Sequence, residues 1–348
     1  MTTLEDIARQ AGLSHSTVSR ALADSPLVNA ETKARIQIIA KAVGYQVNQV
    51  ARNLKSRSTR MIGLIVPEVS NPYYPKVVQK VADEVREAGY SLQLSLSGSG
   101  QEAESACIAH LREHRADGIL LITAEQGLVA RNEVNLLVKT GVPIVLMGWV
   151  EEADHVDMVT GDDAAGGYQL ATHLVSLGHK RIAILGKSPH RGAFDRVAGF
   201  IRALDEAGVA LPLELVVLAI NEAEVQSGVA KLLALSDPPT AIFAYQDSLA
   251  ALVYKYLAEA GVSIPDDMTV VGFDDLELAT YLSPKLTTVG AHIEPLASKF
   301  VRLLFDRIQD GRDSRPPRHS IVTPKLVVRG SSAAPRPEQD LVIKEIIQ

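Results

Sequence analysis

Residues 3–22 read TLEDIARQAGLSHSTVSRAL, and this stretch decides how the amino-terminal part of the chain folds. Its apolar residues recur at helical spacing in two short runs, separated by Gly12-Leu13-Ser14. Thr3 and Ser14 are residue types that cap the first turn of a helix, and Gly12 suits the left-handed backbone of a tight turn. The stretch therefore predicts a helix–turn–helix, in which the short turn makes the helices cross steeply and leaves the second one protruding.

A third helix is predicted from Asn29, which can cap it, to Gly44, which ends it. The outward residues of the second helix are small hydrogen-bonding groups with one long cation: His15, Ser16, Ser19 and Arg20, with Thr17 at the edge. Such groups suit base edges and phosphates in the major groove of DNA. A plain helical hairpin with a polar face is the alternative.

The charge of the chain is unevenly distributed. Residues 1–60 hold nine lysines and arginines against four acids, whereas the rest of the chain holds 26 bases and 37 acids, so that charges of +5 and −11 make up the total of −6. A basic head on an acidic body favours a polyanionic partner for the head alone. Charge by itself leaves a solvated polar face as an equal alternative.

Length and composition exclude several classes of protein. A chain of 348 residues is expected to form two or three domains. The charged N-terminus lacks a secretory apolar segment, and no apolar run approaches the roughly 18 residues of a membrane span. A single cysteine, Cys107, fits the reducing cytoplasm, and no Cys/His spacing indicates a metal. We expect a cytoplasmic protein without a metal or cofactor.

From Met61 onward, short apolar runs alternate with amphipathic segments. The first set comprises runs within 61–68, 91–97, 118–123 and 144–149 with helices near 74–88, 104–114 and 129–139; the second comprises runs within 181–186, 213–219, 240–246 and 269–275 with helices near 193–207, 223–235 and 248–260. A helix near 293–308 and a strand over 320–328 complete the pattern. Strands that are apolar on both faces predict parallel, doubly wound sheets in two similar lobes.

Ligands of such sheets bind outside the carboxyl ends of the strands. The residues that follow the apolar runs mix aromatics, amides, carboxylates and an arginine: Asn71, Pro72, Tyr73, Tyr74, Trp149, His190, Arg191, Gln246, Asp247, Asp274 and Asp275. This mixture can stack on the apolar face of a sugar ring and hydrogen-bond its hydroxyls. Structural alternatives are a cap for Asp274, an ion pair on a helix face for Arg196 and a core position for Trp149.

An enzyme is not expected, and no catalytic residue is assigned. The chain lacks the GxxxxGK[ST] phosphate loop, a GxGxxG after the first strand and a GxSxG elbow. Asp274 and Asp275 are neighbours within one loop, so they cannot face each other across a glycosidic bond as the carboxylates of a glycosidase do.

The ordered motifs resemble the LacI/GalR (lactose-repressor) family of bacterial transcription regulators. After residues 3–22 they are GYQVNQVAR at 44–52, SNPYY at 70–74, LGHKRIAIL at 177–185, RVAGF at 196–200, IPDDMTVVGFDD at 264–275 and LTTV at 286–289. The resemblance runs from Thr3 to about Ser332 without large gaps. It implies a homodimer, or a tetramer, that binds a pseudo-palindromic operator and responds to a small effector.

The expected architecture is an all-α helix–turn–helix head plus an α/β body, whose two doubly wound parallel-sheet lobes are of the periplasmic-binding-protein-like type. The expected domains are a DNA-binding domain (1–47), a hinge helix and linker (48–60), an effector-binding and dimerisation domain (61–332) and a C-terminal tail (333–348). Within 61–332 the N-lobe takes about 61–160 plus 292–318, and the C-lobe about 161–291 plus 319–332.

The resemblance implies that His15, Ser16 and Arg20 read bases, while Thr3, Thr17 and Ser19 contact phosphates. Asn29 caps the third helix and is a candidate backbone contact. In the hinge, Ala51 would pack against the partner's hinge and Leu54 would be the apolar wedge between base pairs in the minor groove, with Arg52 and Lys55 on flanking phosphates. Many members have proline where this chain has Gln49, so the free hinge is expected to be less ordered here.

Three residues, Arg196, Gln246 and Asp274, match positions that clamp hydroxyls in sugar-responsive members. Tyr73, Tyr74, Trp149 and His190 fall at or beside effector positions, and Asn71 precedes them. Purine-responsive members have an arginine where this chain has His190 and a hydroxyl where it has Gly192, which favours a sugar or sugar derivative. A purine-responsive regulator and a solute-binding protein of sugar transport remain alternatives. Whether the effector induces or co-represses stays open.

Overall fold

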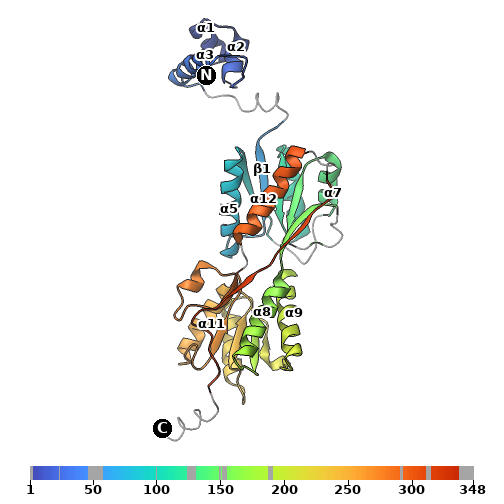
Figure 1. Ribbon diagram of the computed structural model, residues 1–348, viewed down its shortest axis with the longest axis vertical. Coiled ribbons are helices and arrows are strands. Elements are labelled where there is room, and N and C mark those ends of the chain that lie inside the picture. The colour runs from blue at the N-terminus through green and yellow to red at the C-terminus, as the bar shows by residue number, and fades with distance from the viewer. Residues whose placement is uncertain are drawn as a thin grey trace. The chain divides into compact units, whose positions relative to one another are not determined.

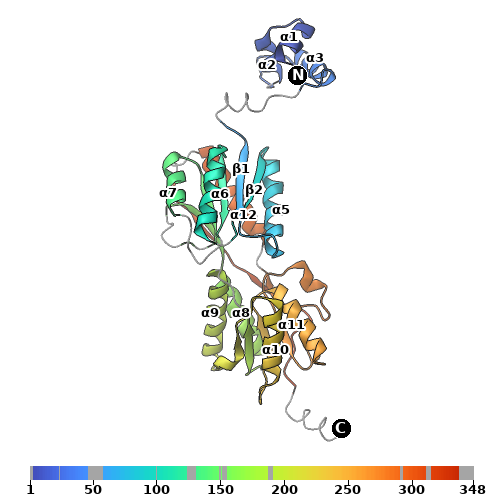
Figure 2. The same ribbon diagram turned by 180° about the vertical axis from the view of Figure 1, so that it is seen from behind.

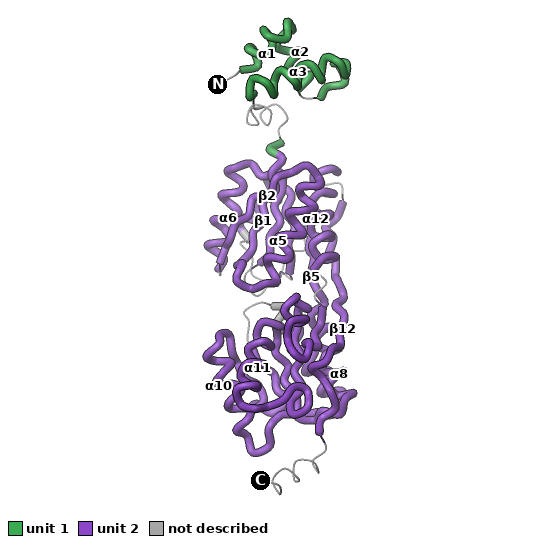
Figure 3. The backbone as a smooth tube through the Cα atoms, turned by 90° about the vertical axis from the view of Figure 1, so that its left-hand side faces the viewer, with its two compact units in different colours: residues 1–59 green, residues 60–348 purple. Residues whose placement is uncertain are grey.

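The computed structural model divides the chain into two compact units, residues 1–59 and residues 60–348 (Figure 3). It describes residues 3–22, 24–45, 58–98, 100–123, 131–148, 150, 155–186, 191–290, 293–310 and 315–336, with only the backbone of 131 and 191–193. Among these residues, no helix is long and apolar enough to cross a membrane.

Unit 1 is a bundle of three helices, as predicted: α1 (Leu4–Ala11), α2 (His15–Leu22) and α3 (Ala30–Ala42). Thr3 and Asp6 form a reciprocal capping box at the start of α1, and Gly12 ends that helix with a left-handed φ of 65°. The Ser14 hydroxyl accepts the Thr17 N–H at 3.2 Å and so begins α2. The small core consists of Ile7, Ala8, Ala11, Val18, Ala21, Val28, Ile36 and Ala40.

The first sheet of unit 2, in the N-lobe, has six parallel strands in the order β11-β5-β4-β3-β1-β2. They are β1 (Met61–Val66), β2 (Ser91–Leu96), β3 (Gly118–Ile122), β4 (Ile144–Met147), β5 (Asp157–Gly161) and β11 (His319–Val322). Helices α5 (Tyr73–Glu87) and α12 (Ile293–Asp310) cover one face, and α6 (Gln101–Glu113) and α7 (Arg131–Thr140) cover the other (Figures 1 and 2). Hydrophobic clusters therefore fill both faces of the sheet.

The second sheet, in the C-lobe, has four parallel strands in the order β7-β6-β8-β9. They are β6 (Ile182–Leu185), β7 (Val216–Val217), β8 (Ala241–Ala244) and β9 (Thr269–Val271). Helices α8 (Asp163–Ser176) and α9 (Arg191–Glu206) lie side by side on one face, and α10 (Glu222–Leu233) and α11 (Asp247–Glu259) lie on the other (Figures 1 and 2). The prediction of two doubly wound parallel sheets is confirmed.

Three parts of the sequence fold differently from the prediction. The expected strand over 320–328 is broken into β11 and β12 (Lys325–Val327) at Pro324, which has no N–H to donate to a ladder. Since β11 pairs with β5, residues 319–322 join the N-lobe sheet, and the predicted lobe boundary at 318/319 falls too early. The expected strand over 213–219 shortens to β7, preceded by the 3-10 turn η1 (Leu213–Leu215). Residues 157–176, without a predicted element, form β5 and α8.

The chain passes between the lobes from β5 to α8, from β10 (Thr288–Gly290) to α12 and from β11 to β12. Strands β10 and β12 pair antiparallel, with Val289 opposite Leu326. We call this two-stranded pair the crossover ribbon, because one of its strands leads into the N-lobe and the other returns from it. It borders the C-lobe sheet through an isolated bridge between Asp274 and Gly290.

Helices α8 and α9 touch backbone to backbone. A Cβ added to Gly167 would lie 1.8 Å from the Arg196 carbonyl oxygen, and one added to Gly199 would lie 1.9 Å from the Ala164 carbonyl oxygen. Since no side chain fits at either place, glycine is required for this approach. The contact fixes the first turn of α8, which carries Asp163, against the turn of α9 that carries Arg196.

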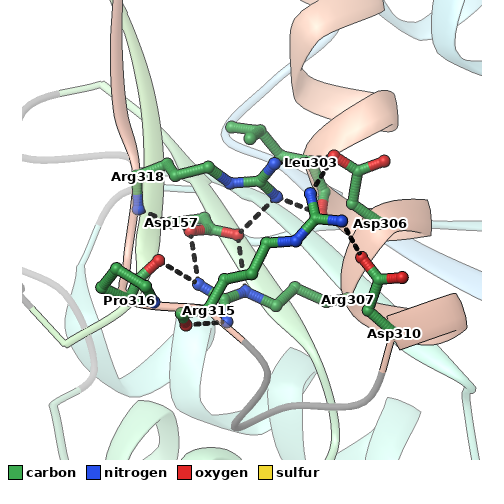
Figure 4. Close-up of polar contacts among 8 residues, drawn as sticks. All are labelled: Asp157, Leu303, Asp306, Arg307, Asp310, Arg315, Pro316 and Arg318. Carbon is green, nitrogen blue, oxygen red and sulfur yellow. Dashed lines mark hydrogen bonds and ion pairs between the residues drawn. The ribbon is translucent and has the colours of Figure 1, made fainter.

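At the amino end of β5, Asp157 is saturated with hydrogen bonds (Figure 4). Its fully buried carboxylate accepts from Arg307 Nε at 2.8 Å and Nη2 at 2.9 Å, and from the Arg318 N–H at 2.7 Å. Burial acts to raise the pKa of Asp157, but the hydrogen bonds from Arg307 and Arg318 outweigh it and hold that pKa below its usual value. Because Arg307 also donates to the Arg315 and Pro316 carbonyls, this group ties the start of β11 to α12.

Candidate DNA interface and effector site

The protruding face of α2 carries the predicted base-reading residues. His15, Ser16 and Arg20 are exposed, while Thr17 and Ser19 are half-buried at the edge of this face. Within the described part of unit 1, the side chains of His15, Ser19 and Arg20 make no hydrogen bond or ion pair. Their donors and acceptors are therefore available to a partner.

The other predicted head residues have bonds within the head itself. The Thr3 hydroxyl accepts the Asp6 N–H and donates to its carboxylate. The Thr17 hydroxyl lies 2.8 Å from Ser14 Oγ, and Asn29 Oδ1 accepts the Thr32 N–H at 2.8 Å as the cap of α3. These residues thus have structural roles, and their contacts with DNA stay predictions. The hinge candidates Ala51, Arg52, Leu54 and Lys55 lie outside the described residues.

In unit 2, Arg196 lies between two carboxylates at the carboxyl ends of the strands. Its Nη2 is 3.2 Å from Asp163 Oδ1 and its Nη1 is 3.5 Å from Asp274 Oδ1. Nη1 also donates to the Tyr245 carbonyl at 2.7 Å, and the guanidinium carbon lies 3.8 Å from the centroid of the Phe273 ring. We call Asp163, Arg196 and Asp274 the Arg196 cluster.

The Arg196 cluster is not saturated. The Arg196 side chain is only 12% exposed, and its buried Nε has no hydrogen-bond partner among the described residues. An unpaired buried donor costs free energy unless another molecule accepts from it. One cation also faces two carboxylates here, so the cluster carries an excess of one negative charge when both are ionised.

Burial shifts the protonation of both carboxylates. It raises the pKa of Asp274 to about 6, with Arg196 opposing the rise and Asp163 adding to it. Burial likewise raises the pKa of Asp163, again against the charge of Arg196. The two groups share one cation, so a proton or a hydrogen-bond donor is favoured beside them.

Tyr73 and Tyr74, at the start of α5 in the N-lobe, lie close enough to the Arg196 cluster to sense its charges. Burial raises the pKa of both phenols, and the negative charge of Asp274 raises it further. The two rings meet edge to face, with centroids 5.4 Å apart. Both hydroxyls therefore remain protonated near Asp274, as hydrogen-bonding groups beside aromatic surfaces.

Two further candidates start helices next to this cluster. Asn71 Oδ1 accepts the Tyr73 N–H at 3.0 Å, which orients the first turn of α5. Gln246 precedes α11 and follows Tyr245, the residue whose carbonyl binds Arg196. Of the other predicted ligand residues, Trp149 and His190 lie outside the described part of the chain.

The sequence prediction missed Asp163 and Phe273. Asp163 follows β5, a strand whose sequence DMVTG mixes an acid, a hydroxyl and a glycine and so gave no apolar run to mark its end. Phe273 stands in an apolar run of the sequence with no sign of a role in the site, whereas its ring supports the Arg196 guanidinium. The same rule about strand ends would have found Asp163 once β5 was known.

Among the described residues, no group of three or more His, Cys, Asp or Glu side chains could hold a metal ion.

Known proteins resemble this chain over nearly its full length. Residues 3–48 match the family described as bacterial regulatory proteins, lacI family, and residues 171–332 match the periplasmic binding protein-like domain. The HTH-type transcriptional repressor PurR of Photobacterium profundum is 31% identical, across 95% of this chain and 98% of that protein.

Two solved structures are similar in fold and sequence. The complex of the transcriptional regulator CelR with cellobiose has a TM-score of 0.70 and 27% identity, and covers 95% of this chain and 100% of its own. A LacI family regulator from Enterococcus faecium with bound ribose has a TM-score of 0.70 and 28% identity, and covers 79% of this chain and 100% of its own.

A helix–turn–helix head followed by a periplasmic-binding-protein-like body defines a DNA-binding transcriptional regulator. The chain belongs to the lacI family of bacterial regulatory proteins.

Proposed function

We propose that the protein is a cytoplasmic repressor of a carbohydrate-utilisation operon, which binds a pseudo-palindromic operator as a homodimer and whose affinity for DNA is controlled by a sugar or sugar derivative. The observation that carries the effector part is the unsaturated Arg196 cluster: a buried guanidinium with an unpaired Nε between two carboxylates.

The chemistry of a sugar complements these groups. Ring hydroxyls can accept from Arg196 and donate to Asp163 and Asp274, while the apolar face of a sugar ring can stack on Tyr73 or Tyr74. The carboxylates with raised pKa values favour hydroxyl donors beside them. The bound cellobiose and ribose of the two similar structures support the same class of effector.

The head supplies the DNA-binding part of the proposal. His15, Ser16 and Arg20 would read base edges from α2, with Arg20 as the candidate for a bidentate guanine contact. The hinge would insert Leu54 into the minor groove, and effector binding would change the order of residues 48–56 and so the spacing of two heads. This division assigns DNA binding to 1–47, the hinge to 48–60 and effector binding and dimerisation to 61–332.

Exposed apolar residues on one edge strand and just past another support association with a second copy. Leu94 and Leu96 on β2 are 38% and 53% exposed, and Leu218 and Ile220, just past β7, are 64% and 63% exposed. Both β2 and β7 are at the edges of their sheets. A homodimer would cover this apolar surface, and a tetramer built from such dimers is the alternative assembly.

The effector is identified by a thermal-shift screen of full-length protein against D-glucose, D-ribose, cellobiose, D-gluconate, glucose 6-phosphate and hypoxanthine. A ligand that binds the folded state raises the melting temperature. A shift with a neutral sugar supports the proposal, whereas a shift with hypoxanthine alone indicates a purine-responsive regulator. Gel-shift titrations then compare binding of the protein to its own promoter region and to random DNA, with and without the ligand. They test whether the ligand controls the affinity for DNA.

Leu54→Ala separates a regulator from a solute-binding protein. It should weaken operator binding at least tenfold and leave the sugar-induced thermal shift unchanged, since Leu54 is proposed to contact DNA and not the effector. Equal loss of both activities would contradict the hinge role. Absence of any preference for the promoter over random DNA would favour a solute-binding protein of sugar transport, and turnover of a sugar would indicate an enzyme.

A further inference from the structure

The loop that carries Asp274 has an unusual backbone. Asp274 has a φ of 106° and Asp275 a φ of 49°, both in the region that favours glycine. Side chains at such angles cost free energy, so the surrounding structure must hold them there. The geometry of the Arg196 cluster depends on this loop, because Asp274 Oδ1 is 3.5 Å from Arg196 Nη1.

Three contacts hold the loop. The Asp274 N–H donates to the Val289 carbonyl at 2.8 Å, in β10 of the crossover ribbon. The buried Asp247 carboxylate accepts the Leu276 N–H at 2.7 Å and the Thr288 hydroxyl at 2.6 Å. Arg329 Nη2 donates to Asp275 Oδ1 at 2.6 Å. The first two contacts fix the backbone on either side, and the third fixes the side chain next to Asp274.

Arg329 is itself rigidly placed just past β12. Its side chain is 17% exposed, its Nη1 donates to the Leu286 carbonyl at 2.9 Å, and its N–H donates to the Thr287 hydroxyl at 2.9 Å. Two residues later, the buried Ser331 hydroxyl accepts the Thr287 N–H and donates to the Val270 carbonyl. Arg329 therefore joins the loop of Asp274 to the end of the crossover ribbon.

The opposite end of the same connection is also fixed by an arginine. Arg318 precedes β11, and both its N–H and its guanidinium contact the buried Asp157 in the N-lobe. Residues 318–329 thus form one connection between the lobes, bonded to Asp157 at one end and to Asp275 at the other. Only the Asp275 end lies beside the proposed effector site.

We propose that Arg329 is a positioning residue for effector binding: its ion pair with Asp275 holds Asp274 toward Arg196 and links that carboxylate to the connection between the lobes. The role of Arg329 in effector binding rests on the proposed function. The positioning of the loop is independent of it, since the contacts are present in the protein alone.

The test compares Arg329→Met and Asp275→Asn with Arg336→Met in the full-length protein. Arg329→Met removes the guanidinium but keeps a long apolar side chain, and asparagine tolerates the positive φ of residue 275. Arg336→Met is the matched control, because Arg336 lies on the same C-terminal segment as Arg329. It pairs with Asp266 and Asp267 and touches neither Asp274 nor Asp275.

The first readout is amide hydrogen exchange without any ligand, followed by mass spectrometry of peptides spanning 272–276. Both variants should increase exchange there at least tenfold, with the rest of the C-lobe unchanged, and Arg329→Lys should lie between them and the natural protein. The control should leave 272–276 unchanged. Unchanged exchange in Arg329→Met, or an increase spread over the whole C-lobe, overturns the positioning role.

The second readout is the thermal shift produced by whichever of D-glucose, D-ribose or cellobiose stabilises the natural protein. Arg329→Met should weaken affinity for that sugar at least tenfold, and Arg336→Met should not. An increase in exchange confined to 272–276, together with unchanged affinity for the sugar, overturns only the role of Arg329 in effector binding. If no compound of the panel stabilises the natural protein, the proposed function fails while the exchange result still decides whether Arg329 positions the loop.

Discussion

Unit 2 contains two groups of arginine and aspartate side chains: the Asp157 group, made of Asp157, Arg307 and Arg318, and the Arg196 cluster. The same residue types stabilise the fold in the first group and are proposed to bind a ligand in the second. Asp157 is one carboxylate between two arginines, and its oxygens accept from the Arg307 guanidinium and from the N–H and guanidinium of Arg318, although Arg318 Nε is itself buried without a partner among the described residues (Figure 4). Arg196 is one cation with two carboxylates and retains an unpaired buried Nε. The groups therefore differ in charge balance: an anion held by two cations stabilises the fold, whereas two carboxylates that share one cation leave an acceptor for a ligand's hydroxyl.

The largest effect is expected at the Asp157 group. Asp157→Ala leaves Arg307 without its buried anion and Arg318 with only Asp306, which should cost about 3–5 kcal/mol of the free energy of unfolding. Calorimetry should show a melting temperature lower by roughly 10 °C. Asp310→Ala is the control, since its partner Arg315 is half exposed and such a pair contributes at most about 1 kcal/mol. Equal losses in both variants would remove the distinction.

Arg196→Met should affect the ligand more than the fold. The loss of the cation leaves Asp163 and Asp274, which can take up protons, so the melting temperature should fall by less than in Asp157→Ala. The stabilisation by a sugar, about 2.7 kcal/mol at one hundred times Kd, should disappear. Arg202→Met, on the exposed side of α9, should keep the full shift. A preserved shift in Arg196→Met would show that the effector binds elsewhere.

The two groups should respond to pH with opposite signs. Between about pH 4 and pH 6, folded Asp274 retains a proton that the unfolded chain has lost, because its pKa rises from 3.8 to about 6. Its contribution to stability is therefore lost as the pH rises through 6. Asp157 has a lowered pKa, so its contribution is present above pH 3.8 and is lost as the pH falls through the folded value.

Asp274→Asn tests the pH dependence of stability that is expected from Asp274. The variant should melt at a higher temperature than the natural protein at pH 7.5 and at nearly the same temperature at pH 4.5, with weaker sugar binding throughout. Melting curves across this pH range measure the difference. A stability difference that is larger at pH 4.5 than at pH 7.5 would contradict the raised pKa of Asp274.

The head offers a similar contrast with smaller expected effects, between Asn29, which stabilises the fold, and Arg20, which is available to a ligand. Asn29→Ala removes the cap of α3 and should cost about 1 kcal/mol of head stability, while Asn29→Ser should restore most of it. Arg20→Ala should leave the melting of the head unchanged and reduce the preference for operator over random DNA. Thermal melts and gel-shift titrations measure the two effects. Loss of stability in Arg20→Ala would assign it a structural role.

The sequence predicted those parts of the fold whose signals are local. Caps at Thr3, Ser14 and Asn29 and the apolar runs marked the helices of the head and most strands. It missed β5, because that strand is short and mixed in polarity, and with it Asp163. It also joined β11 and β12 into one strand, although Pro324 marks the break. Pairings such as Arg329 with Asp275, 54 residues apart, depend on tertiary structure that no local pattern contains.

The glycine contact between α8 and α9 limits how this protein could be engineered for a different effector. Because Gly167 and Gly199 bring the two backbones together, substitutions there cannot widen the space between Asp163 and Arg196 without separating the helices. A redesign for larger ligands would have to keep this pair as a fixed anchor. The room would come from trimming Tyr73 and Tyr74 on the opposite lobe.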